Sequence, residues 1–231
     1  MAMGPARTEA GRPFRSPALR ALWRAKVVAS SRLRLRRFGF EGRSYPFFFH
    51  PYNKTWANER QVEVPIARRV VRGVDPARTL EVGNVLSHYV RVRHRVLDKY
   101  ERAPGVANED FLDHSPDDPY RLVLAVSTFE HIGWDEDDRD PRKFLRAVQH
   151  AQGILAPGGL LAFTVPLGYN PEVDRFAASR PPGFHFAFME SFGPRPGQWR
   201  QAERCAGETH PYDPTGKARG ILVASWQKHR R

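Results

Sequence analysis

The sequence predicts an α/β domain built on a mostly parallel sheet, and three apolar runs carry this prediction. Thr79–Val82 is a short apolar run that ends at Gly83. Leu122–Val126 is continuously apolar, as a strand buried on both faces of a parallel sheet should be. Leu160–Val165 is a third such run and follows a Pro-Gly-Gly turn. Apolar runs that alternate with helical segments are typical of a parallel sheet covered by helices.

Helices are expected around these runs. One precedes the first strand and ends near Val71. Asp140 followed by Pro141, and Asn170 followed by Pro171, each combine a favoured helix cap with a residue suited to the first helical position. Towards the end of the chain we expect strands over Phe184–Met189 and Gly220–Trp226, with a helix over Trp199–Cys205 between them.

The composition excludes several classes of protein. The 231 residues are 41% hydrophobic and 27% charged, an ordinary balance for a soluble globular domain. No stretch approaches the roughly 20 apolar residues of a membrane-spanning helix. The single cysteine, Cys205, cannot form an internal disulfide and has no metal-ligand spacing with another cysteine. We therefore expect a cytoplasmic protein and no metal site.

The net charge of +12 is concentrated at the N-terminus, where residues 1–45 carry +9. We divide the chain into this basic arm and a domain over residues 46–231. Leucines and Trp23 recur at helical spacing within residues 17–28, with basic residues between them. In one interpretation, the arm is solvent-exposed or packed on the domain without a partner of its own. Alternatively, residues 17–38 bind a membrane surface or a glycolipid. Nucleic acid is less favoured as a partner, because aromatic residues are not interleaved with the basic ones.

Two features at the first strand suggest a nucleotide-binding edge. Gly83 allows the backbone to turn sharply and to approach a ligand closely. A second strand over Arg95–Leu97 ends at Asp98, 15 residues after that glycine. A carboxylate at this place can accept hydrogen bonds from both hydroxyls of a ribose. This short spacing leaves room for a helix of about two turns between the strands.

The order of these pieces resembles that of class I S-adenosylmethionine-dependent methyltransferases over residues 46–231. The family's Glu-x-Gly-x-Gly-x-Gly loop is matched at Glu81 and Gly83, but its second and third glycines are replaced by Val85 and Ser87. The segment Ser127–Ile132, with its Glu-His pair, and the phrase Leu-x-Pro-Gly-Gly-x-Leu at residues 155–161 are closer matches. The resemblance implies a Rossmann-like, doubly wound, seven-stranded sheet with an antiparallel last strand and helices on both faces.

The resemblance also implies a set of site residues. Those expected to bind S-adenosylmethionine are Glu81, Gly83, Asn84, Val85, Asp98, Glu109, Asp110, Ser127, Thr128 and Phe129. His131 is the candidate general base, with Asp135 behind it. In the family, the segment before the first strand often covers the cofactor, which here corresponds to residues 46–72. Residues of this cap and of the pocket mouth that can shape the acceptor site are Tyr52, Asn53, Trp56 and Tyr212.

The implied function is methyl transfer from S-adenosylmethionine to a small-molecule acceptor, for which a sugar or lipid-linked glycan is our hypothesis. Three alternatives stay open. Glu81, Gly83 and Asp98 would also suit a nicotinamide-dependent oxidoreductase. The basic arm would suit an RNA methyltransferase. The altered glycine loop would suit a methyltransferase fold that has lost its cofactor and acts as a partner subunit.

Overall fold

The computed structural model of the protein describes residues 36–203, 212 and 218–230. The helical pattern within residues 17–28, most of the proposed membrane contact at residues 17–38, and Cys205 lie outside the described residues. No helix in the described part of the chain is long and apolar enough to span a bilayer.

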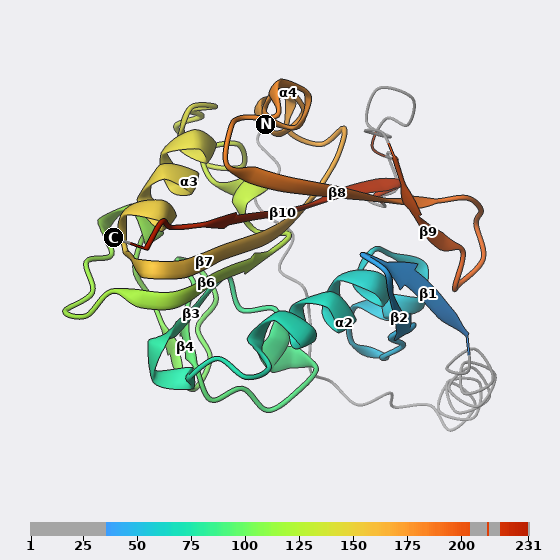
Figure 1. The fold of residues 1–231 in the computed structure, drawn as a ribbon, viewed down its shortest axis with the longest axis horizontal. Helices are drawn as coiled ribbons and strands as arrows, with labels where there is room; N and C mark the ends of the chain where they lie inside the picture. The colour runs from blue at the N-terminus through green and yellow to red at the C-terminus, as the bar shows by residue number, and fades with distance from the viewer. Residues whose placement is uncertain (1–35, 204–211, 213–217, 231) are drawn as a thin grey trace.

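The central sheet confirms the predicted doubly wound, Rossmann-like fold, with strands in the order β5-β4-β3-β6-β7-β10-β8-β9 (Figure 1). The strands are β3 (Thr79–Val82), β4 (Arg95–Leu97), β5 (Val106–Ala107), β6 (Tyr120–Val126), β7 (Leu155–Pro166), β8 (Phe184–Ser191), β9 (Trp199–Ala202) and β10 (Gly220–Gln227). Neighbours from β5 to β7 pair in parallel, whereas β10 pairs antiparallel with β7 and β8. The chain therefore winds outward from β3 to β5, returns to β6, and winds outward the other way.

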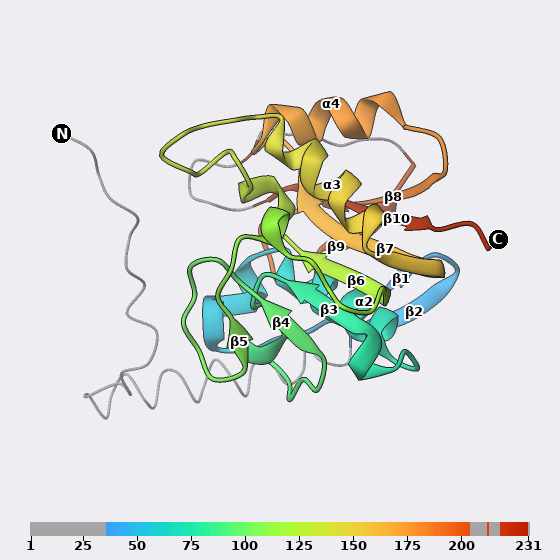
Figure 2. The same cartoon turned by 90° about the vertical axis from the view of Figure 1, so that its left-hand side faces the viewer.

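Helices cover both faces of the sheet, with α3 (Lys143–Gly153) and α4 (Pro171–Ser179) on one side and α2 (Arg60–Val71) on the other (Figures 1 and 2). The alternation of side chains along β6 sets this arrangement. Leu122 and Leu124 are buried with residues of α2, whereas Val123 and Ala125 are buried with residues of α3 and α4. The sheet thus has a packed core on each face.

The segment before β3 is fastened to the face that α2 covers. A hairpin of β1 (Arg37–Phe40) and β2 (Arg43–Pro46) buries Phe38 against a cluster that includes Met189 and Trp199. Pro65 lies inside α2 and cannot donate a hydrogen bond to the carbonyl of Gln61 four residues earlier. The backbone N–H of Phe48 donates to that carbonyl instead, at 2.9 Å. The proline therefore creates the acceptor that holds the cap segment on the helix.

Two predicted helices were wrong, and tertiary pairing explains both. Trp199–Ala202 is the edge strand β9, paired antiparallel with β8, so the sheet has eight strands rather than seven. Burial of Trp199 in the cluster under the hairpin outweighs the helical propensity of its neighbours. The expected two turns between β3 and β4 shrink to one 3₁₀ turn, Leu86–His88, in which Leu86 is buried. The helices after Asp140 and Asn170 were predicted correctly, and both side chains accept a backbone N–H there.

Candidate active site

The candidate site lies where the winding of the sheet reverses, at the carboxyl ends of β3 and β6. Ligands of open α/β sheets bind in the crevice at such a switch point. The loop after β3 begins with Gly83, and the loop after β6 begins with Ser127. The structure therefore brings together two segments that the sequence separates by more than 40 residues.

Glu81 shapes the loop after β3 from inside the protein. Its side chain is fully buried, and Oε1 accepts the N–H groups of Val85 and Leu86 at 3.1 and 2.7 Å. Its other oxygen lies 2.7 Å from Nε2 of His94. Both oxygens are thus used by the protein, so Glu81 positions the loop and is not a cofactor contact in this structure.

Asp98 also serves mainly to hold the loops. Oδ2 accepts the N–H of Asn84 at 3.1 Å, and Oδ1 accepts the N–H groups of Tyr100 and Glu101 at 2.9 and 2.7 Å. A carboxylate has about four lone-pair sites, so Asp98 retains one. It can accept one ribose hydroxyl rather than the two that were expected.

A second acid stands beside Asp98. Glu101 Oε1 accepts Nδ2 of Asn84 at 2.9 Å and lies 3.0 Å from Nε2 of His88. The His88 ring stacks on Tyr52 with centroids 4.2 Å apart. Tyr52 of the cap therefore contacts the loop after β3, and Glu101 adds a partly exposed acid there that the sequence analysis did not select.

Gly83 and Thr128 join the two loops. Gly83 has φ +85°, and a Cβ at this position would meet Thr128 Oγ1 at 2.1 Å. Ser127 has φ +39°, a strained conformation for a residue with a side chain. Its hydroxyl donates to Glu63 Oε1 at 2.6 Å. The strain is therefore held in place by a buried bond to α2, and such strain is concentrated at functional sites.

The first turn of α2 brings charged side chains under these loops. Arg60 forms an ion pair with the fully buried Glu63 and lies 3.9 Å from Glu59. Glu130, after β6, is 1% exposed, and neither of its carboxylate oxygens has a hydrogen-bond partner within the described residues. One oxygen of Glu59 is also without a partner there. Glu130 has an ion-pair contact with His131, whose Nε2 lies 3.4 Å from Oε1. Buried carboxylate oxygens without a hydrogen-bond donor are rare, and a ligand that supplies donors would account for these.

His131 and Asp135 form the predicted pair. Nδ1 of His131 lies 2.5 Å from Asp135 Oδ2, and Tyr169 donates its hydroxyl to the same carboxylate at 2.6 Å. Burial alone would lower the pKa of His131, but Glu130 and Asp135 together raise it above its usual value. The ring of Tyr212 packs against that of Tyr169 at a tilt of 58°, with centroids 4.9 Å apart, so Tyr212 lies beside this group.

The burial of Glu130 predicts a pH-dependent stability. Burial raises the pKa of Glu130 to about 7, with His131 opposing part of the shift. The folded protein thus holds this proton more tightly than the unfolded chain, so ionisation of Glu130 destabilises the fold increasingly as the pH rises from about 4.5 to 7.

We expect Glu130→Gln, which cannot ionise, to be more stable than the wild type at pH 8, by up to about 3 kcal/mol. The advantage should shrink as the pH falls towards 4. Urea unfolding of both proteins across this range measures the difference, and an equal difference at every pH would show that Glu130 titrates normally.

Several predicted site residues lie elsewhere. The side chain of Phe129 is fully buried and stacks on Phe111 in the core, because it faces the α3 side of the sheet. Val85 and Trp56 pack into the clusters under α2 and the hairpin. None of these three side chains is placed for cofactor contact.

The two acids after β5 are also engaged by protein groups. Glu109 pairs with His114. Asp110 caps the turn at Phe111–Asp113 and lies 2.8 Å from Nζ of Lys99. Burial would raise the pKa of Asp110, but the hydrogen bond from Lys99 lowers it overall. Asn53 contributes its carbonyl, which accepts from Asn58 within the cap.

The structure adds residues that the sequence analysis missed. Glu63 and Glu130 are buried acids next to predicted residues, and Tyr169 is the third member of the His131 and Asp135 group. Glu130 directly precedes His131, so the sequence pattern located this segment. The sequence did not reveal that the side chain of Glu130 is buried. Glu63 stands one helical turn after Arg60, a spacing that places both on one face of α2.

Comparison with solved structures returns methyltransferases. N-methyltransferase NodS from Bradyrhizobium japonicum is 13% identical with a TM-score of 0.42, over 74% of this chain and 96% of that one. The 1,6-didemethyltoxoflavin N1-methyltransferase from Burkholderia thailandensis is 13% identical with a TM-score of 0.44, over 95% and 93%. A putative rRNA methylase from Clostridium thermocellum is 11% identical with a TM-score of 0.41, over 73% and 97%.

No protein-family model and no curated protein matches the sequence. The TM-scores lie below 0.5 and the identities are low. The assignment of the fold therefore rests on the strand order and pairing of the sheet itself, which is that of a class I methyltransferase with one added edge strand.

Proposed function

We propose that the protein transfers a methyl group from S-adenosylmethionine to a small-molecule acceptor at the switch point between β3 and β6. The observation that carries the proposal is the buried Glu130, whose carboxylate has no hydrogen-bond donor among the described residues and only an ion-pair contact of 3.4 Å with Nε2 of His131. The strand order supports the proposal, because ligands of open α/β sheets bind beyond the carboxyl ends of the strands at such a switch point.

Three of the residues near the switch point carry groups that would bind the ribose and the amino acid part of S-adenosylmethionine. Asp98 retains one acceptor site, and Glu101 beside it is 39% exposed, so these acids together can accept a pair of ribose hydroxyls. Arg60 is the cation nearest Glu130 in α2 and suits the carboxylate of an amino acid group. S-adenosylmethionine, when bound, supplies an activated methyl group on a sulfonium.

His131 would act on the acceptor. An acceptor hydroxyl, such as that of a sugar, loses its proton as its oxygen bonds to the methyl carbon and the carbon–sulfur bond breaks. Nε2 of His131 is the ring nitrogen that would accept this proton, because Nδ1 is held by Asp135. Oε1 of Glu130 lies 3.4 Å from Nε2 and would stabilise the imidazolium that forms. Asp135 and Tyr169 orient the ring. Transfer should therefore accelerate as the pH rises through the raised pKa of His131.

The non-catalytic alternative is favoured by a specific contact. Thr128 occupies the space directly over Gly83, and most of the capacity of Asp98 is used by the backbone. A binding experiment separates the two proposals: the enzyme binds S-adenosylmethionine and S-adenosylhomocysteine, whereas the partner protein binds neither.

A further inference from the structure

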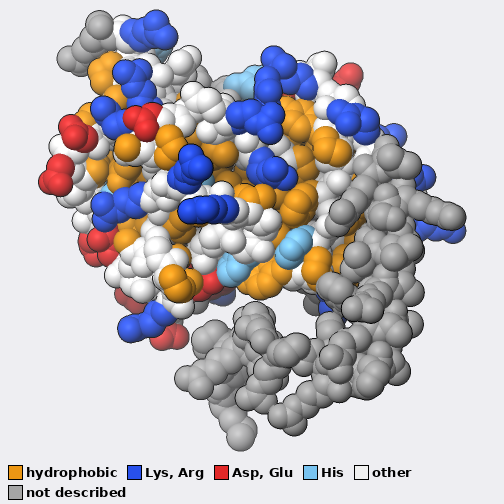
Figure 3. Space-filling view, turned by 90° about the horizontal axis from the view of Figure 1, so that it is seen from below, with side chains coloured by type: hydrophobic (Ala, Val, Ile, Leu, Met, Phe, Trp, Pro, Cys, Tyr) orange, Lys and Arg blue, Asp and Glu red, His pale blue; other side chains and the backbone are white. Residues whose placement is uncertain are grey.

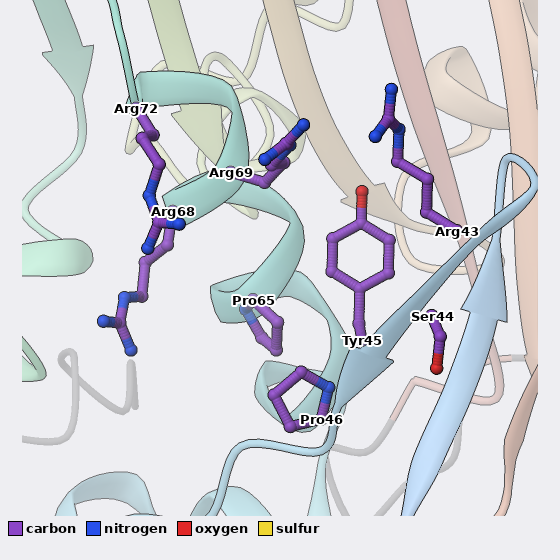
Figure 4. Close-up of a pocket in the computed structure, with 8 residues that line it drawn as sticks. All are labelled: Arg43, Ser44, Tyr45, Pro46, Pro65, Arg68, Arg69 and Arg72. Carbon is purple, nitrogen blue, oxygen red and sulfur yellow. The ribbon is translucent and has the colours of Figure 1, made fainter.

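A groove at the far end of α2 carries a concentration of positive charge that the proposed function does not use. It measures about 520 Å³ and lies between β2 and the last turns of α2. Four arginines line it, Arg43, Arg68, Arg69 and Arg72, and no acidic side chain lines it (Figure 4). The face of the molecule that α2 covers is generally basic, with acidic side chains mainly towards its margins (Figure 3).

These four guanidinium groups are exposed and have no ion-pair partner among the described residues. Arginines elsewhere on the surface do have one, as Arg146 pairs with Asp140 and Arg200 with Glu190. Like charges gathered around a hollow repel one another, and their combined field draws anions into it.

The helix dipole explains only part of this cluster. Arg68 and Arg69 lie in the last turn of α2, where basic residues stabilise a helix. Arg72 lies beyond the helical residues in an extended conformation, and Arg43 comes from the hairpin. Two separate elements therefore direct basic side chains to one groove, which a helix end alone would not require.

The arrangement of the side chains indicates the kind of ligand. In Figure 4, Arg43 and Arg69 extend on either side of the Tyr45 hydroxyl. Arg68 and Arg72 are four residues apart, at the end of the helix and just beyond it, and extend from its other flank. Tyr45 and the rings of Pro46 and Pro65 form a less polar wall between these pairs. A guanidinium group can bind two oxygens of one phosphoryl group through parallel N–H groups. Two pairs of arginines therefore suit a ligand with two phosphoryl groups.

We propose that this groove binds a ligand with more than one phosphoryl group, whose organic part rests against Tyr45 and the two prolines. The site is distinct from the candidate active site. Arg60 is the first residue of α2, whereas Arg68, the first arginine of the helix that lines the groove, lies eight residues later, roughly 12 Å along the helix axis.

The test is a calorimetric titration of the full chain at low salt with inorganic tripolyphosphate and with inorganic phosphate. Tripolyphosphate should bind at least about tenfold more tightly, because it can meet both pairs. Arg43→Gln with Arg69→Gln, and Arg68→Gln with Arg72→Gln, should each weaken tripolyphosphate binding by about 10- to 100-fold. The control variant, Arg142→Gln with Arg146→Gln, removes the same charge at the start of α3, on the other face of the sheet. It should change the affinity for tripolyphosphate by less than about threefold.

Vesicles of phosphatidylcholine, with and without phosphatidic acid, identify the source of the phosphoryl groups. Binding that requires phosphatidic acid and is lost in the groove variants indicates a lipid-borne ligand, and binding of tripolyphosphate alone indicates a soluble one. The proposal is overturned if the wild type binds no tripolyphosphate, or if the control variant loses as much affinity as the groove variants. Neither result bears on binding of S-adenosylhomocysteine, which tests the other site.

Discussion

Replacing Gly83 with alanine should destabilise the protein by about 2–6 kcal/mol and remove any affinity for an adenosyl ligand. The backbone at this position has φ +85°, which an alanine adopts only with strain. The added Cβ would also stand 2.1 Å from Oγ1 of Thr128 and 2.9 Å from its Cβ. The loops after β3 and β6 would have to separate, and both contribute to the candidate site.

Gly105 provides a matched control for the strain alone. Its φ is +83°, but no atom lies within 4 Å of a Cβ built there. Gly105→Ala should therefore cost only about 1–3 kcal/mol, and the difference between the two variants measures the clash with Thr128. Urea unfolding gives both values.

A second variant shows whether Thr128 is the cause. Adding Thr128→Ala to Gly83→Ala removes the two nearest atoms and should restore part of the lost stability. Equal stability losses for Gly83→Ala and Gly105→Ala would contradict the proposed contact between the loops.

His131→Ala should lower methyl transfer by about 10²–10⁴-fold while leaving the affinity for S-adenosylhomocysteine within a few-fold of the wild type. The side chain is half exposed and faces the site, so its removal leaves the core unchanged. The expected loss comes from the missing proton acceptor. Transfer can be followed as labelled methyl from S-adenosylmethionine into a deproteinised extract of small molecules.

The control for this variant is His185→Ala, which removes an exposed histidine from β8 that pairs with Glu41. It should leave turnover unchanged. A loss of only a few-fold in His131→Ala would show that this histidine lines the pocket without acting as a base. Label that enters RNA rather than the small-molecule extract would contradict the proposed acceptor class.

The parallel half of the fold was predictable because its strands are buried on both faces. Leu122–Val126 has no polar residue to obscure it, and Asn170 with Pro171 places a helix start within a residue. The edge strand β9 was missed because its residues favour a helix by themselves. What makes it a strand is pairing with β8, a contact that local sequence does not encode.

The candidate site was predictable in position but not in detail. The glycine and the acids at the strand ends located the switch point correctly. The sequence could not show that Glu81 and Asp98 are largely occupied by backbone N–H groups, because these bonds depend on how the loops close. Nor could it show that Glu130 is buried without a hydrogen-bond donor among the described residues, since that requires α2 to cover the loop after β6.

A calorimetric titration with S-adenosylhomocysteine decides whether the switch point binds an adenosyl ligand. We predict binding in the micromolar range, no binding of a nicotinamide cofactor, and weaker binding in Asp98→Ala, which removes a charged acceptor and three hydrogen bonds from loop N–H groups. Absence of binding by the folded wild-type protein would rule out the proposed methyl transfer and favour a non-catalytic methyltransferase fold.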